Sequence, residues 1–139
     1  MPEFSIEVEN YPLRFFATTI GDLDPIRHDE AAARAAGYRS LVAPPTYVSC
    51  LINMADPDPE GLLHLLEIDL KRVLHGEQQI TYHQPICAGD RLFFQTRIAD
   101  IYDRKNGALE FVVLQTQVSN QERVKVAETS TTMVVRNAA

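Results

Sequence analysis

The segment Ala-Pro-Pro-Thr-Tyr-Val-Ser-Cys-Leu-Ile-Asn-Met, residues 43–54, decides the fold. Its two prolines and the threonine after them lead into a helix, because proline is tolerated in the first turn and nowhere further in. The residues that follow are apolar on nearly every side rather than along one stripe. We therefore expect a buried helix over about residues 46–54.

The chain before this helix predicts short elements. Residues 4–8 alternate apolar with polar side chains, which indicates a short, half-buried strand. Asn10 is placed to cap a short helix that ends at Gly21 and Asp22, and Asp29 is placed to cap a second helix over residues 30–36.

The chain after it predicts mainly strands. Residues 56–61 form a loop rich in proline, and residues 62–70 have the apolar pattern of a short helix. Four strands follow, at about residues 73–82, 91–103, 109–119 and 124–135, and the last three are separated by gaps short enough for antiparallel hairpins. A buried helix followed by an antiparallel meander predicts an α+β domain whose sheet wraps around the helix. Such a sheet leaves an edge and outer apolar side chains that a second copy or a partner subunit should bury.

Composition limits the function. The chain has 139 residues, 45% of them hydrophobic, which predicts a single domain over residues 1–139. A formal charge of −6 disfavours nucleic acid, and no apolar run approaches the ~18 residues of a membrane span. Four scattered histidines and two cysteines lack the spacing of a metal site or a disulfide scaffold. With a start unlike a secretory signal, the chain is expected to be cytoplasmic.

The chemistry is concentrated in residues 21–28, Gly-Asp-Leu-Asp-Pro-Ile-Arg-His. An acid near an imidazole suits proton transfer beside a carbonyl. A structural interpretation stands beside this one for each residue. Asp22 can end its helix through an Asx turn, Asp24 before proline can be a turn residue, Arg27 can pair with either carboxylate, and His28 can be a solvated loop residue.

Three segments resemble the hotdog-fold MaoC-like dehydratases, in the N-terminal-type branch that also supplies one subunit of heterodimeric 3-hydroxyacyl dehydratases. They are residues 21–26, residues 32–37 with 41–46, and residues 73–78 through 85–90. The resemblance implies a sheet of five or six strands around the central helix. It also implies acyl thioester substrates, on coenzyme A or an acyl carrier protein, in a tunnel at an interface between subunits. No cofactor is implied beyond coenzyme A as part of the substrate.

In the catalytic (R)-specific hydratases of this superfamily the motif reads Gly-Asp-x-Asn-Pro-(Ile/Leu)-His, and its Asp and His hold the water that adds to the enoyl thioester. Here the Asp position is Asp22, the Asn position is Asp24, and the His position is Arg27, with His28 displaced by one. Arginine stays protonated at neutral pH and is no general base. The candidate catalytic residues are therefore Asp22 and His28.

The candidate substrate-binding residues come from the same loop, from the start of the central helix and from the head of the next strand. Catalytic relatives often present a His-Gly pair at the helix start, whereas Pro44 here has no N–H, so the earliest donors are those of Thr46 and Tyr47. The full set is Asp24, Arg27, Pro45, Thr46, Tyr47, His75, Gly76 and Glu77.

Three functions remain open from the sequence. The first is an (R)-specific enoyl-thioester hydratase or 3-hydroxyacyl-thioester dehydratase, a hydro-lyase, acting alone or as one subunit of a hotdog pair. The second is a non-catalytic acyl-binding subunit that needs a partner hotdog with the Asp and the His. The third is an acyl-CoA thioesterase. The expected assembly is a homodimer, or a heterodimer with a second hotdog subunit.

Overall fold

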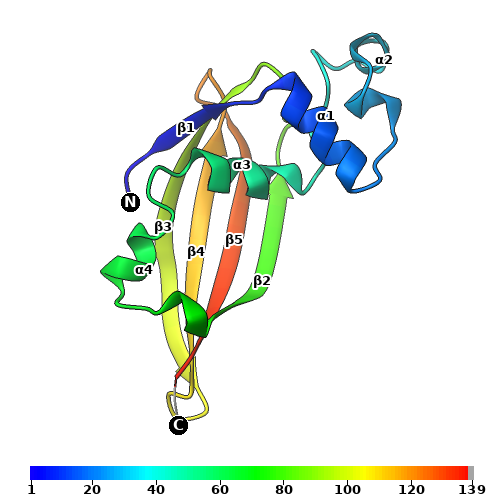
Figure 1. Ribbon diagram of the computed structural model, residues 1–139. Coiled ribbons are helices and arrows are strands. Elements are labelled where there is room, and N and C mark those ends of the chain that lie inside the picture. Colours follow the sequence, from blue (N-terminus) through cyan, green and yellow to red (C-terminus); the bar gives the residue numbers. More distant parts are fainter. Residues whose placement is uncertain (138–139) are drawn as a thin grey trace.

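The computed structural model describes residues 1–137, which form one five-stranded antiparallel sheet with helices on one face and at one end (Figure 1). The helices and strands are, in chain order, β1 (Phe4–Glu7), α1 (Asn10–Thr19), the 3₁₀ turn η1 (Pro25–Arg27), α2 (Glu30–Ala35), α3 (Tyr47–Ala55), α4 (Gly61–Leu65), the 3₁₀ turn η2 (Leu70–Arg72), β2 (Val73–Tyr82), β3 (Arg91–Arg104), β4 (Leu109–Ser119) and β5 (Lys125–Arg136).

The strands lie in the order β1-β3-β4-β5-β2, and every neighbouring pair is antiparallel. The sequence therefore predicted all five strands, with the bounds of β2 and β4 correct to the residue. β2, the first strand after α3, closes one edge of the sheet by pairing with β5, the last strand. The register of that pair shifts between His75 and Glu77, where Gly76 forms a bulge.

α3 crosses the face of the sheet in front of β3, β4 and β5 (Figure 1). Its buried side consists of Tyr47, Val48 and Leu51, which pack with Leu92, Phe94, Val118 and Val126 from the strands beneath. The expected central helix is thus present and begins one residue later than predicted. The expectation that it is buried on nearly every side is wrong, because only one side faces the sheet and Met54 is 57% exposed.

One further expectation needs correction. Asn10 is the first residue of α1 rather than its cap, because Glu9 occupies that position and makes no side-chain cap bond. The outer face of the sheet is mixed, because Gln95 on β3 and Gln115 on β4 lie on it and Phe111, four residues before Gln115, lies on the same face. Large exposed apolar side chains occur on the strands, at Leu74 and Ile101, and also at Tyr11 and Phe15 on α1 and at Leu23 in the loop after it.

No helix within residues 1–137 is long and apolar enough to cross a membrane.

Candidate functional site

The loop between α1 and α2 holds Asp22, Arg27 and His28. Gly21 has a positive φ of 74°, a backbone conformation that glycine adopts readily and that turns the chain sharply at the end of α1. The N–H of Asp22 then donates to the carbonyl of Ala17 at 2.9 Å, which fixes Asp22 against the last turn of α1. Asp24 caps η1 through Ile26 and Asp29 caps α2, as predicted for Asp29.

Arg27 makes an ion pair with Asp22. Its Nε lies 3.0 Å from Oδ2 of Asp22, and the two side chains are only 13% and 24% exposed. The same guanidinium donates from Nη1 to the carbonyl oxygens of Val42 and Ala43, at 3.2 and 3.4 Å. These two residues are themselves fixed, because Val42 donates to Ile26 and Ala43 donates to Ile86. Arg27 therefore ties the loop to the segment that leads into α3.

Both carboxylate oxygens of Asp22 accept a hydrogen bond. Oδ2 accepts from Arg27, and Oδ1 accepts from the N–H of Asp24 at 3.2 Å. Burial acts to raise the pKa of Asp22, but these two hydrogen bonds and the charges of Arg27 and His28 hold the pKa below its ordinary value. A carboxylate held ionised in this way is a weak base and a poor proton donor near neutral pH.

His28 faces the main chain rather than the Asp22 carboxylate. Its Nε2 lies 2.7 Å from the backbone oxygen of Asp22, so this nitrogen is the donor. The two candidate catalytic residues are thus brought together in one loop, but the carboxylate and the imidazole make different contacts. The interpretation of Arg27 as the ion-pair partner of a nearby carboxylate holds for Asp22.

The start of α3 lies beside this loop. The N–H of Tyr47 donates to the carbonyl of Pro44 at 2.9 Å, so one of the two predicted donors is already used within the turn. Pro45 and Thr46 are exposed, and the carbonyl of Pro45 accepts a hydrogen bond of 2.6 Å from the hydroxyl of Tyr82. Burial raises the pKa of Tyr82 to about 12, which keeps this hydroxyl a donor.

Sequence reasoning did not single out Tyr82. The available signal was its place on the predicted strand over residues 73–82, two residues after the apolar Ile80 and therefore on the same face.

The three predicted residues of β2 lie at its bulge. A Cβ on Gly76 would lie 2.7 Å from Cγ2 of Val134 and 3.1 Å from the carbonyl oxygen of Thr132, so the bulge leaves no room for a side chain. His75 lines a pocket on the sheet, whereas Glu77 does not. Gln78 lines the same pocket, and this spacing of three residues departs from strict alternation because the bulge adds a residue.

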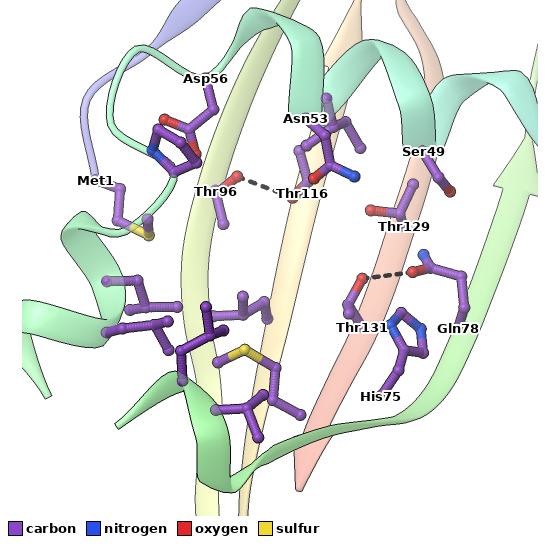
Figure 2. Close-up of a pocket in the computed structure, with 18 of the residues that line it drawn as sticks. Met1, Ser49, Asn53, Asp56, His75, Gln78, Thr96, Thr116, Thr129 and Thr131 are labelled. Carbon is purple, nitrogen blue, oxygen red and sulfur yellow. Dashed lines mark hydrogen bonds between the residues drawn. The ribbon is translucent and has the colours of Figure 1, made fainter. Parts of the chain in front are cut away.

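That pocket, of about 400 Å³, lies between α3, α4 and the inner face of the sheet (Figure 2). One part of its lining is apolar, with Leu62, Leu70, Leu114 and Met133. The other part is polar and comes from α3 and the middle of the strands: Ser49, Asn53, Thr96, Thr116, Thr129 and Thr131. Of the predicted site residues, only His75 lines it.

Within residues 1–137 no group of three or more His, Cys, Asp or Glu side chains is arranged to hold a metal ion.

The chain matches a family of dehydratase domains and a curated relative along almost its whole length. A family model described as "FAS1-like, dehydratase domain region" matches residues 1–129. The UPF0336 protein of Saccharopolyspora erythraea is 35% identical over 138 residues, which cover 99% of this chain and 86% of the relative.

Two solved structures extend the comparison. A chain of the HadBC complex, a 3R-hydroxyacyl-ACP dehydratase from Mycobacterium tuberculosis, is 26% identical with a TM-score of 0.78 over 96% of this chain and 94% of its own. A MaoC-like dehydratase is 25% identical with a TM-score of 0.84 over 97% of this chain and 40% of its own. The chain therefore belongs to the family of FAS1-like dehydratase domains and has the hotdog fold of the MaoC-like dehydratases, as the sequence resemblance implied.

Proposed function

We propose that this chain is the acyl-binding subunit of a two-hotdog (3R)-hydroxyacyl-thioester dehydratase, and that a partner hotdog supplies the acid and the base. The main support is the ion pair of Arg27 with Asp22. In the resembling hydratases a histidine takes the position of Arg27 and shares a water with the aspartate. Here a guanidinium takes that position and occupies the carboxylate.

His28 does not replace the missing histidine in this arrangement. Hydration of an enoyl thioester requires one group that takes a proton from water and another that delivers a proton to the substrate. The Nε2 of His28 is engaged with a backbone carbonyl, and Asp22 is held ionised by its partners. A chain with these contacts contributes binding surface, and the proton transfers fall to the other subunit.

The pocket beneath α3 provides the binding surface. Its volume lies within the range of small-molecule sites, and its lining combines an apolar part with a few polar groups, as such sites do. The similarity to a chain of the HadBC complex, which is a dehydratase assembled as a complex, supports both the substrate class and the need for a partner.

The test compares the chain alone with the chain mixed with a hotdog partner that has an intact Asp…His motif. Hydration of a short enoyl-CoA is followed by the loss of enoyl absorbance. We expect no turnover by the chain alone and turnover by the pair. Within the pair, Asn in place of the partner's motif Asp lowers kcat by at least ~100-fold, while Asp22→Asn in this chain changes kcat by less than about tenfold.

The opposite results identify the other functions. Hydration by the chain alone that is lost in Asp22→Asn contradicts the proposal and makes the chain a self-sufficient hydratase. Release of free coenzyme A thiol, measured with a thiol-reactive dye, makes it a thioesterase. A stable pair that does not hydrate enoyl thioesters also contradicts the proposal.

A further inference from the structure

The floor of the pocket beneath α3 contains a row of three threonines. Thr96, Thr116 and Thr129 are direct cross-strand neighbours on β3, β4 and β5, and their exposed fractions are 6%, 6% and 4%. A pocket for a purely hydrocarbon chain gains nothing from hydroxyls here, because valine has nearly the same shape without the cost of burying a polar group.

Two of the three hydroxyls satisfy each other. Oγ1 of Thr96 and Oγ1 of Thr116 lie 2.8 Å apart. The hydroxyl of Thr129 has no hydrogen-bond partner among residues 1–137, although the residue is almost completely buried and lines the pocket. Among the described residues no buried side-chain nitrogen or oxygen lacks a hydrogen-bond partner, so the Thr129 hydroxyl is open to solvent at the pocket. A ligand that fills the pocket displaces this solvent, and unless it supplies a partner of its own it leaves the hydroxyl unpaired at a cost in binding free energy.

Two further polar side chains line the pocket from the opposite side. Ser49 and Asn53 are four residues apart on α3 and thus lie on the same face of the helix. Neither side chain has a hydrogen-bond partner in the described part of the chain, and both line the pocket (Figure 2). Donors and acceptors from α3 and from β5 therefore border the same space.

The remainder of the lining limits what the ligand is. Leucines of α4, η2 and β4 form an apolar part of the lining, which accommodates hydrocarbon, and Asp56, His75 and Gln78 also border the pocket. At a volume near 400 Å³, and with ~30 Å³ for each group the size of a water molecule, it holds roughly a dozen such groups. A medium-length acyl chain with one oxygen on it satisfies both conditions.

We infer that the pocket selects acyl chains that bear a hydroxyl or keto oxygen beyond the reacting carbons, and that Thr129, with Ser49 and Asn53, hydrogen-bonds this oxygen. The inference rests on the proposed acyl-binding function and names the substrate class for it. Thr129 is then a specificity-determining residue, and the apolar part of the pocket holds the hydrocarbon on either side of the oxygen.

The test measures binding by calorimetry with octanoyl-CoA and with analogues that have a hydroxyl on each carbon of the distal half in turn. The wild-type chain is expected to bind the best hydroxylated analogue about tenfold more tightly than octanoyl-CoA, the effect of one hydrogen bond to an otherwise unpaired group. Thr129→Val is expected to lose this preference and to retain its affinity for octanoyl-CoA. The matched control Thr81→Val makes the same chemical change on the outer face of the sheet and keeps the preference.

Each other outcome has one meaning. Equal binding of all analogues overturns the inference and leaves acyl binding intact. A preference that persists in Thr129→Val also overturns it. If no acyl-CoA binds to the wild-type chain, the proposed function fails, and the inference fails with it.

Discussion

The loop around Asp22 and the pocket beneath α3 use polar side chains in opposite ways. In the loop, the Asp22 carboxylate, the Arg27 guanidinium and the Nε2 of His28 each have a partner within the chain. In the pocket, the hydroxyl of Thr129 has no partner among residues 1–137 and is open to solvent. A region whose polar groups are all paired stabilises the fold, whereas polar groups that line a pocket and are open to solvent are available to a ligand.

The largest difference between the two regions is expected in stability. Arg27→Ala removes the partner of Asp22 and the donor to the carbonyls of Val42 and Ala43, so it should cost about 2–3 kcal/mol of the free energy of unfolding, measured in urea. Arg34→Ala is the control, because it removes an exposed i,i+4 pair with Glu30 and should cost about 0.3–0.5 kcal/mol. Equal costs for both variants would show that the loop is not held by Arg27.

The second prediction concerns how the Asp22 carboxylate makes the free energy of unfolding depend on pH. Because the folded pKa of Asp22 is below its ordinary value, the stability from its ionised form is fully present above about pH 4 and is lost as the pH falls through the folded pKa. Asp22→Asn lacks this contribution. The unfolding free energies of wild type and variant, measured from neutral to acid pH, should differ most near pH 7 and converge below about pH 4. If the two proteins show the same dependence of unfolding free energy on pH, Asp22 is not the source of this contribution.

The smallest effects should separate two threonines of the same row. Thr116→Val leaves the Thr96 hydroxyl without its partner and should cost about 1 kcal/mol. Thr129→Val removes a hydroxyl that has no partner among residues 1–137, so its effect should be within about 0.5 kcal/mol of zero or stabilising. Denaturation of both variants under the same conditions decides this. A cost for Thr129→Val as large as that for Thr116→Val would mean that its hydroxyl is paired inside the fold.

The fold could be predicted closely from local patterns. Residues 73–82 and 109–119 are strands with the expected bounds, because a loop with Pro85 follows the first and Gly107 and Asn120 flank the second. The helix over residues 47–55 was found from its apolar composition, but composition does not tell how many sides a single sheet covers. Asn10 failed as a cap because Glu9 is the residue with extended backbone geometry in front of the helix.

Less of the candidate site than of the fold could be predicted from the sequence. The ion pair of Arg27 with Asp22 was one of the interpretations open from the sequence, since the two residues are five apart in one loop. The pocket was not found, because its polar floor requires the register that places Thr96 beside Thr116 and Thr116 beside Thr129. These pairs lie 20 and 13 positions apart in the chain, and their register depends on irregularities near Ile98 and Val118 that the sequence pattern did not indicate.

The bulge at Gly76 has a consequence for which side chains border the pocket. It lets His75 and Gln78 line one hollow although they are an odd number of positions apart on the strand. If the strand paired regularly through Gly76, without the bulge, one of these two side chains would turn to the opposite surface. The backbone at this one glycine therefore decides which neighbours on the strand share the hollow.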